Sequence, residues 1–185
     1  IIKSDCPRAG DLLLMPINKL CIKDCCICTL RELEKLRNNR TIANLSISFQ
    51  DSTSNVNKIE SVAEIFDSCP NLTQLELNIK HAMKYEFYIA LQHCVHVTDL
   101  TISIFYLNHL DGLMRNCNFT HVYIKCYISS VPVEKILQKC EQIFSTCKKL
   151  ERIDFEQLDS KTSRWTACQY EVGSIQVNFY PSSKI

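Results

Sequence analysis

The chain has 185 residues, of which 46% are hydrophobic and 22% charged, and its formal net charge is +1 at pH 7. This composition is typical of a globular protein and excludes wholesale disorder, and the near-zero charge provides no overall field that would recruit nucleic acid. No apolar run approaches the ~20 residues that cross a bilayer, and the few glycines form neither of the glycine-rich phosphate-binding motifs.

A short phrase, apolar-x-x-apolar-x-apolar, recurs along the chain, usually with a cysteine three residues before it. The clearest copy is Cys69-Pro-Asn-Leu72-Thr-Gln-Leu75-Glu-Leu77. Successive copies are 22 to 31 residues apart, which is the period range of leucine-rich repeats. The central apolar positions are 20, 45, 75, 100, 122, 153 and 175.

Helical stripes are predicted between these phrases. The first begins at Thr29, and the longest follows Pro132 with Ile136, Cys140 and Ile143 on one side. Loops are predicted over 51–58 and 159–165. The phrases themselves alternate apolar and polar residues, so we expect at least five parallel strands with helices on the opposite face. The strands should centre near residues 21, 46, 76, 101, 123 and 154.

These patterns predict an α/β fold, a leucine-rich repeat solenoid shaped as a horseshoe arc, with a parallel concave sheet and convex helices. Residues 1–185 would form a single leucine-rich repeat domain of about seven units. The chain begins with Ile1 rather than Met, which is consistent with a fragment of a longer protein.

The phrase around Cys69 and the similar Phe144-Ser-Thr-Cys147-Lys-Lys-Leu150 resemble the cysteine-containing class of leucine-rich repeats. That class is similar to the C-terminal repeats of F-box substrate receptors, which bind proteins for ubiquitination. The resemblance implies a protein ligand on the concave face, and a ubiquitin-ligase adaptor that binds an N-terminal region preceding Ile1. The family residue after each strand, Asn or Cys, is kept only at Cys25, and no F-box-like segment is present.

The twelve cysteines leave two compartments open. Their spacing follows the repeat, so most are expected to be buried, reduced thiols, which favours a cytoplasmic or nuclear location. Secretion is the alternative, because four N-x-[ST] sequons begin at Asn39, Asn44, Asn71 and Asn118. The cluster Cys25-Cys26-x-Cys28 lacks the second pair that a zinc site needs.

The solvent-directed positions of the expected strands are polar and of mixed sign, which suits a protein partner better than nucleic acid. Tyr123 and Arg152 are the strongest candidate anchors, since both residue types are over-represented at binding hot spots. The predicted protein-binding residues are Glu76, Asp99, His121, Tyr123, Lys125, Arg152, Asp154 and Glu156.

No catalytic or metal-binding arrangement is evident in the sequence, so we expect no enzyme, no cofactor, no metal, no nucleic-acid partner and no membrane contact. The favoured function is protein binding as the substrate-recognition module of an F-box-type ubiquitin ligase. Two alternatives remain, the repeat region of an innate-immune sensor or intracellular scaffold, and a secreted or cell-surface receptor fragment.

Overall fold

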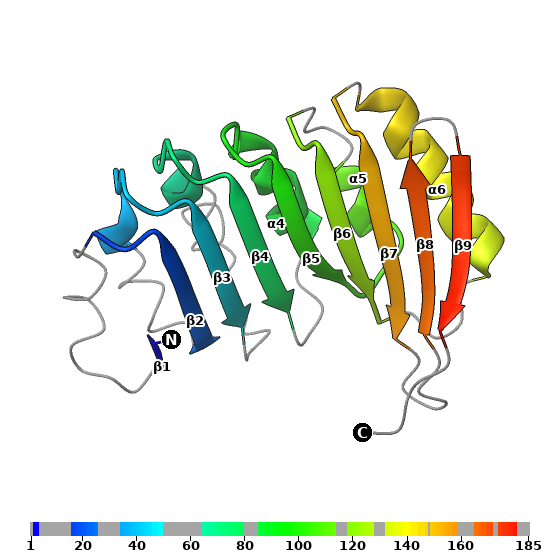
Figure 1. Ribbon diagram of the computed structural model, residues 1–185, viewed down its shortest axis with the longest axis horizontal. Helices are drawn as coiled ribbons and strands as arrows, with labels where there is room; N and C mark the ends of the chain where they lie inside the picture. The colour runs from blue at the N-terminus through cyan, green and yellow to red at the C-terminus, as the bar shows by residue number, and fades with distance from the viewer. Residues whose placement is uncertain are drawn as a thin grey trace.

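The described residues form one sheet of nine strands whose order in space is their order in the sequence (Figure 1). The computed structural model describes residues 2–3, 16–25, 34–49, 64–79, 85–113, 118–127, 132–147, 149–158, 165–171 and 174–180. The strands are β1 (Ile2–Lys3), β2 (Lys19–Cys25), β3 (Asn44–Phe49), β4 (Gln74–Ile79), β5 (Asp99–Ile104), β6 (His121–Cys126), β7 (Arg152–Leu158), β8 (Trp165–Glu171) and β9 (Ser174–Tyr180).

The described helical segments lie on one side of this sheet (Figure 1). They differ in length, from three residues in η1 to fourteen in α6. The segments are η1 (Glu34–Leu36), a helical turn at 64–67, α4 (Tyr85–Ala90), η3 (Leu91–His93), α5 (His109–Leu113) and α6 (Val133–Thr146).

The predicted strand positions are confirmed for β2 to β7. From β2 to β6, each strand pairs in parallel with the next, and the central apolar residues of the phrases share register, as in Leu45 with Leu75 and Leu75 with Leu100. The longest predicted helix is confirmed as α6, which begins after Pro132. Of the loop predicted over 159–165, the last residue, Trp165, is instead the first residue of β8. The other residues of this predicted loop lie outside the described part, as do Thr29 and 51–58.

The predicted fold class, a leucine-rich repeat solenoid, is wrong. A solenoid would stack like units, each a parallel strand followed by a helix. Here the sheet reverses after β7, because β8 and β9 both pair antiparallel with the preceding strand. The phrase around Ile175 therefore belongs to an antiparallel hairpin rather than to a seventh parallel unit. The fold is of the α/β class, with a sheet that is parallel from β1 to β7 and antiparallel at its C-terminal end, and with few helices among the described residues.

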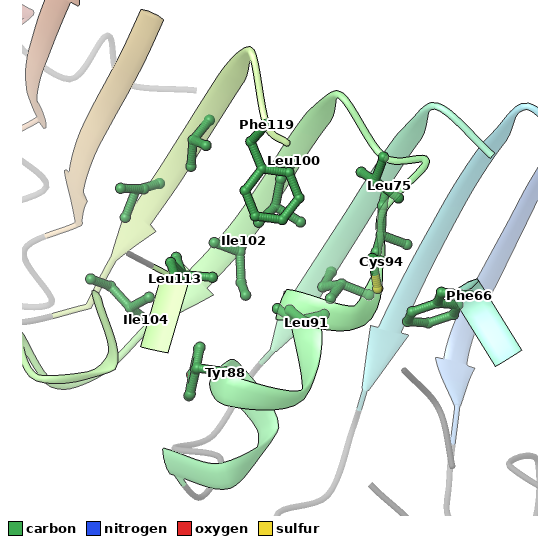
Figure 2. Close-up of a cluster of buried hydrophobic side chains, with 14 of the residues drawn as sticks. Phe66, Leu75, Tyr88, Leu91, Cys94, Leu100, Ile102, Ile104, Leu113 and Phe119 are labelled. Carbon is green, nitrogen blue, oxygen red and sulfur yellow. The ribbon is translucent and has the colours of Figure 1, made fainter. Parts of the chain in front are cut away.

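The core lies between the sheet and the helical side (Figure 2). Every second residue of β3 to β7 contributes to it, which is the period of a strand with one buried face. Tyr88 of α4 and Phe66 of the turn at 64–67 are both fully buried among the strand residues. The strands thus expose a single polar side opposite the helices.

Cysteines occupy the junctions that lead into three strands. Cys69, Cys94 and Cys147 are buried before β4, β5 and β7. The Cys69 thiol is free and donates to the backbone carbonyls of Leu36 (3.2 Å) and Ile65 (3.3 Å). Burial raises the pKa of the Cys94 thiol to about 12. These junctions favour a small apolar group with a weak donor, as cysteine provides. Cys117 lies outside the described residues.

Helices α4 and α5 approach closely at Gly112. A Cβ built at this position would lie 2.8 Å from Tyr88 Cβ and 3.0 Å from the Tyr88 carbonyl carbon. Gly→Ala inside a helix normally stabilises, by about 0.5–1 kcal/mol. Here we expect Gly112→Ala to destabilise by about 1–3 kcal/mol, because the buried Tyr88 backbone would have to shift. Urea unfolding of the variant tests this, and an unchanged or higher midpoint would show that the two helices separate freely.

Candidate binding face on the sheet

The side of β3 to β7 opposite the helices is polar, and we call it the polar face. Because buried and solvent-directed residues alternate along each strand, the solvent-directed residues of neighbouring strands lie in rows across the sheet. One such row contains Glu76, Thr101, Tyr123 and Asp154. The members of the polar face are Asn44, Ser46, Ser48, Gln74, Glu76, Asn78, Asp99, Thr101, Ser103, His121, Tyr123, Lys125, Arg152, Asp154 and Glu156.

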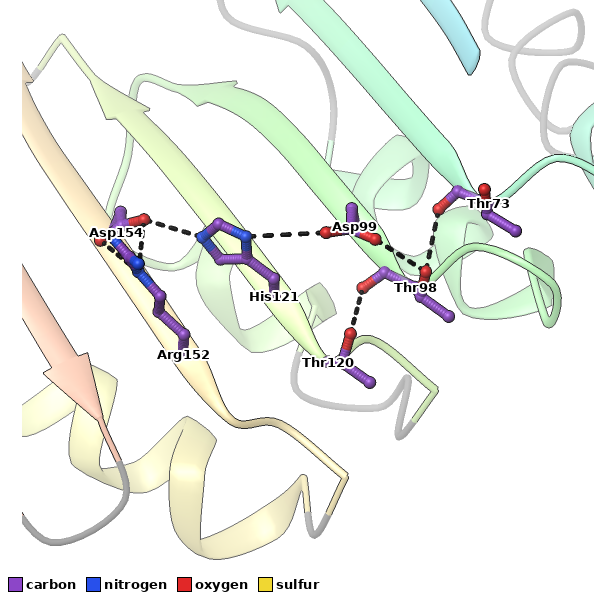
Figure 3. Close-up of polar contacts among 7 residues, drawn as sticks. All are labelled: Thr73, Thr98, Asp99, Thr120, His121, Arg152 and Asp154. Carbon is purple, nitrogen blue, oxygen red and sulfur yellow. Dashed lines mark hydrogen bonds and ion pairs between the residues drawn. The ribbon is translucent and has the colours of Figure 1, made fainter. Parts of the chain in front are cut away.

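A ladder of backbone contacts at the strand entries sets this register. The carbonyl of Thr73 accepts hydrogen bonds from the backbone N–H of both Thr98 and Asp99. The carbonyl of Thr98 does the same for Thr120 and His121. The Thr120 hydroxyl adds a third donor to the carbonyl of Thr98, at 3.3 Å, and the Thr98 hydroxyl lies 3.3 Å from the carbonyl of Thr73 (Figure 3). The ladder holds neighbouring strands in step, so the polar rows stay aligned.

A group of charged side chains, which we call the charged row, lies just inside this ladder (Figure 3). It consists of Asp99, His121 and Arg152, which are in register, and of Asp154 from the neighbouring row. His121 Nε2 is 2.7 Å from Asp154 Oδ2, and its Nδ1 is 3.6 Å from Asp99 Oδ1. Arg152 Nε donates to Asp154 Oδ1 at 3.0 Å and forms an ion pair with Oδ2 at 2.9 Å. Asp99 also accepts from the Thr98 hydroxyl at 2.8 Å. The imidazole therefore links β5 to β7, and Asp154 positions the arginine.

A second polar cluster centres on Glu76. Its carboxylate accepts from Ser46 Oγ (2.8 Å), Asn78 Nδ2 (2.9 Å) and Lys125 Nζ (3.3 Å). Burial alone would raise the pKa of Glu76, but the hydrogen bonds from Asn78 and Ser46 and the charge of Lys125 outweigh it and lower that pKa. Glu76 is therefore ionised at neutral pH.

Lys125 reaches across a whole strand to join this cluster. It extends from β6 over β5 to β4, where Nζ also donates to Asn78 Oδ1 at 3.0 Å. Ser103, its register partner on β5, is only 1% exposed, and its hydroxyl has no hydrogen-bond partner among the described residues. The long lysine side chain thus covers a small residue while its charged end stays partly exposed.

Tyr123 and Glu156 form the third contact of the face. The Tyr123 hydroxyl donates to Glu156 Oε2 at 2.8 Å. Burial first, and then the hydrogen bond and negative charge of Glu156, raise the pKa of Tyr123. The phenol therefore remains a proton donor at physiological pH. Glu156 is only 8% exposed, and this hydrogen bond provides its carboxylate with a partner.

A hollow of about 270 Å³ opens on the polar face towards the strand entries. Two carboxylates, from Glu76 and Asp99, line it together with His121 and Lys19. Amide and hydroxyl groups line it at Asn44, Gln74, Ser46 and Thr101, and three leucines complete the lining, Leu20, Leu45 and Leu75. The volume is just below the ~300–1,000 Å³ of drug-sized ligand pockets, so it suits one long side chain or a small polar molecule.

All eight residues predicted as protein-binding lie on the polar face, in three groups. Asp99, His121, Arg152 and Asp154 form the charged row; Glu76 and Lys125 meet in the second cluster; Tyr123 pairs with Glu156. Ser46 and Asn78, which the sequence placed on the same face but which are not among the eight, also bond to Glu76. Their positions in the strand phrases next to Glu76 were the available signal.

Metal coordination is not supported where the structure describes side chains. No group of three or more His, Cys, Asp or Glu residues there could hold a metal ion. Of the cluster Cys25-Cys26-x-Cys28, only Cys25 lies within the described part, at the end of β2. The described helices include none that is both long and apolar enough to span a membrane.

The chain was also compared with known proteins. No family model and no curated protein matches it. Among solved structures, it is similar to pyridoxal kinase from Bacillus subtilis in complex with ADP, at 8% identity and a TM-score of 0.45. The match covers 84% of this chain and 69% of that chain. Because the matched protein is an enzyme, the prediction that this chain is not one is corrected and withdrawn. At this identity and TM-score, the likeness assigns no activity to the chain.

Proposed function

We propose that this chain binds a protein partner through the polar face. The observation that supports this most is the arrangement of Arg152. Its Nε is held by Asp154, and none of the side chains that the structure describes bonds to its two Nη groups. An arginine fixed in this way presents a planar fork to a carboxylate with little further loss of side-chain freedom.

Tyr123 supports the same reading. Its hydroxyl is tied to Glu156, and the ring is therefore held on the face next to the charged row. A stiff aromatic group beside a preset arginine is the combination found at protein-binding hot spots. The signs of charge are mixed along the face, which favours a protein surface over a polyanion.

The hollow provides a second point of attachment at the other end of the face. Glu76 and Asp99 present carboxylates to it, so a basic or amide side chain of the partner would find acceptors there. The role in ubiquitin ligation remains a prediction that rests on the sequence resemblance. The cytoplasmic or nuclear location remains a prediction that rests on the spacing of the cysteines.

The test replaces the two anchors together. Tyr123→Ala with Arg152→Ala should raise the partner's Kd by about thirtyfold or more, which corresponds to about 2 kcal/mol. Arg37→Ala is the matched control, because Arg37 is an exposed arginine that also pairs with a carboxylate, that of Glu34, but on the helical side. The partner is first identified by photocrosslinking from Thr101 and then titrated, as purified protein, by calorimetry.

Melting curves establish that the double variant keeps its fold. If Arg37→Ala abolishes binding while the double variant binds as the native chain does, the partner contacts the helical side and the proposal is wrong.

Tyr123→Phe separates the contribution of the Tyr123 ring from that of its hydroxyl. It removes the hydrogen bond to Glu156 and keeps the ring, so a loss much smaller than that of Tyr123→Ala is expected.

A further inference from the structure

Strand β9 forms one edge of the sheet. It pairs with β8 along its full length, from Ser174 with Glu171 to Tyr180 with Trp165. No described residue pairs with its other side, because β9 is the last strand in the sheet order. The opposite edge is different, since β1 has only two residues. A seven-residue edge strand leaves a row of backbone donors and acceptors available for pairing.

The composition of β9 does nothing to discourage such pairing. Its sequence, Ser-Ile-Gln-Val-Asn-Phe-Tyr, contains no charged residue and no proline. Edge strands are commonly protected by lysine, by proline, by a bulge or by being short. The register of β8 with β9 is continuous over all seven pairs, so no bulge twists the edge away.

The register rows make β9 complementary to itself. Ile175 lies in the row of Tyr170 and the buried Ile153, and Val177 lies in the row of Cys168 and the buried Phe155. Gln176 lies in the row of Gln169 and Asp154. Apolar positions are therefore odd-numbered, and polar positions are even-numbered apart from the aromatic Tyr180.

Antiparallel pairing of two copies about Val177 keeps this alternation. Val177 would lie opposite Val177 of the second copy, Ile175 opposite Phe179, Gln176 opposite Asn178, and Ser174 opposite Tyr180. This centre uses all seven residues of β9, whereas a centre at Gln176 or Asn178 uses five. The odd-numbered positions of both copies then lie on one face of the joined sheet and the even-numbered positions on the other, and the sheet continues across the two-fold axis.

We propose that two copies of this chain associate through antiparallel pairing of β9 about Val177. The partner is a second copy rather than an unrelated strand, because the alternation and the length of β9 match under the two-fold operation itself. The polar faces of the two copies lie on the same side of the joined sheet, so the dimer presents two binding faces to one partner surface. A partner with repeated sites would then gain from simultaneous attachment.

The first experiment reads the register through charge. Gln176→Lys with Asn178→Lys places like charges at both opposed positions, whereas Gln176→Glu with Asn178→Lys places opposite charges there. Sedimentation equilibrium of the 185-residue chain over roughly 1–500 µM should show a reversible dimer. The double-lysine variant should raise the dimer Kd by about tenfold, and the charge-paired variant should restore it.

A monomeric native chain over this range would overturn the proposal. So would a double-lysine variant that dimerises as well as the native chain, since the interface would then lie elsewhere. A charge-paired variant as weak as the double-lysine one would show that Gln176 and Asn178 are not opposed, and the stated pairing would be wrong.

A second measurement does not depend on the charged variants being stable. Val177→Cys brings two thiols together across the two-fold axis, where paired Cα atoms are about 4.5–5.5 Å apart, within disulfide range. Ile175→Cys is the matched control, because its two copies would be four residues out of register, about 14 Å apart. Both variants are made with Cys168→Ser, because Cys168 is the register partner of Val177 and its thiol would compete within the chain. Mild oxidation followed by peptide mass spectrometry should then identify the 177–177 link and no 175–175 link. Equal linking at both positions would contradict the proposed register.

Discussion

Leu77→Ala should lower the free energy of unfolding by about 2–5 kcal/mol, as for other fully buried leucines. Leu77 is 0% exposed and lies in the middle of β4, in register with Ile47 and Ile102, which are also fully buried. Truncation would open a cavity with strand neighbours on both sides, and the paired backbones on either side cannot move in to fill it. Urea unfolding followed by circular dichroism measures the change.

Gln74→Ala is the matched control on the same strand. Gln74 is exposed at the start of β4, so its truncation should change stability by no more than about 0.5 kcal/mol. Similar losses at both positions would mean that β4 is not oriented with its odd-numbered residues in the core. A loss below about 1 kcal/mol at Leu77 would mean that the core around it collapses to fill the space.

The parallel strands could be predicted because each is a local pattern. The phrase around Leu75 and Leu77 alternates apolar and polar residues with a period of two, and that period alone fixes which residues share a face. For the same reason Glu76 and Tyr123 could be assigned to one surface before any contact was known. Their assignment needed only the register of neighbouring phrases, which the recurring cysteine and leucine positions supply.

The C-terminal hairpin was not predicted because its signal was read as another repeat. The phrase around Ile175 has the right apolar spacing, but Gly173 precedes it by two residues. Glu171 and Ser174 are paired, so the connection between β8 and β9 is two residues long, and glycine in such a short link is typical of a hairpin. A parallel strand would have needed a crossover of a dozen residues or more.

The contacts within the polar face lay beyond sequence reasoning for a different reason. Lys125 bonds to Asn78 and Glu76, which are separated from it by 47 and 49 residues. Whether a lysine reaches across an intervening strand depends on the size of the residue beneath it, here Ser103. Alternation predicts that these residues face the same side, but it does not predict which of them meet.

His109 is a buried histidine that binds no described polar group through Nδ1. It is 3% exposed, stacks on Tyr88 at 4.2 Å between ring centroids, and meets the edge of Tyr106 at 5.2 Å. Burial lowers the pKa of His109 to about 4, from the ordinary 6.5. Protonation of this ring therefore favours the unfolded chain, in which the imidazole is hydrated.

The sign of the pH effect follows from that depressed pKa. Above about pH 6.5 the imidazole is neutral in both states and does not affect stability; as the pH falls from there towards 4, only the unfolded chain takes up the proton. His109 should therefore cost the native state about 2 kcal/mol at pH 5 and up to about 3 kcal/mol below pH 4.

His109→Phe keeps an aromatic ring against Tyr88 and removes the titration. Urea unfolding at pH 7.5 and pH 5.0 should show a loss for the native chain that is about 2 kcal/mol larger than for the variant, with other carboxylates and histidines contributing equally to both. Equal losses would mean that His109 is hydrated in the native state, and that the contact between α4 and α5 is open to water.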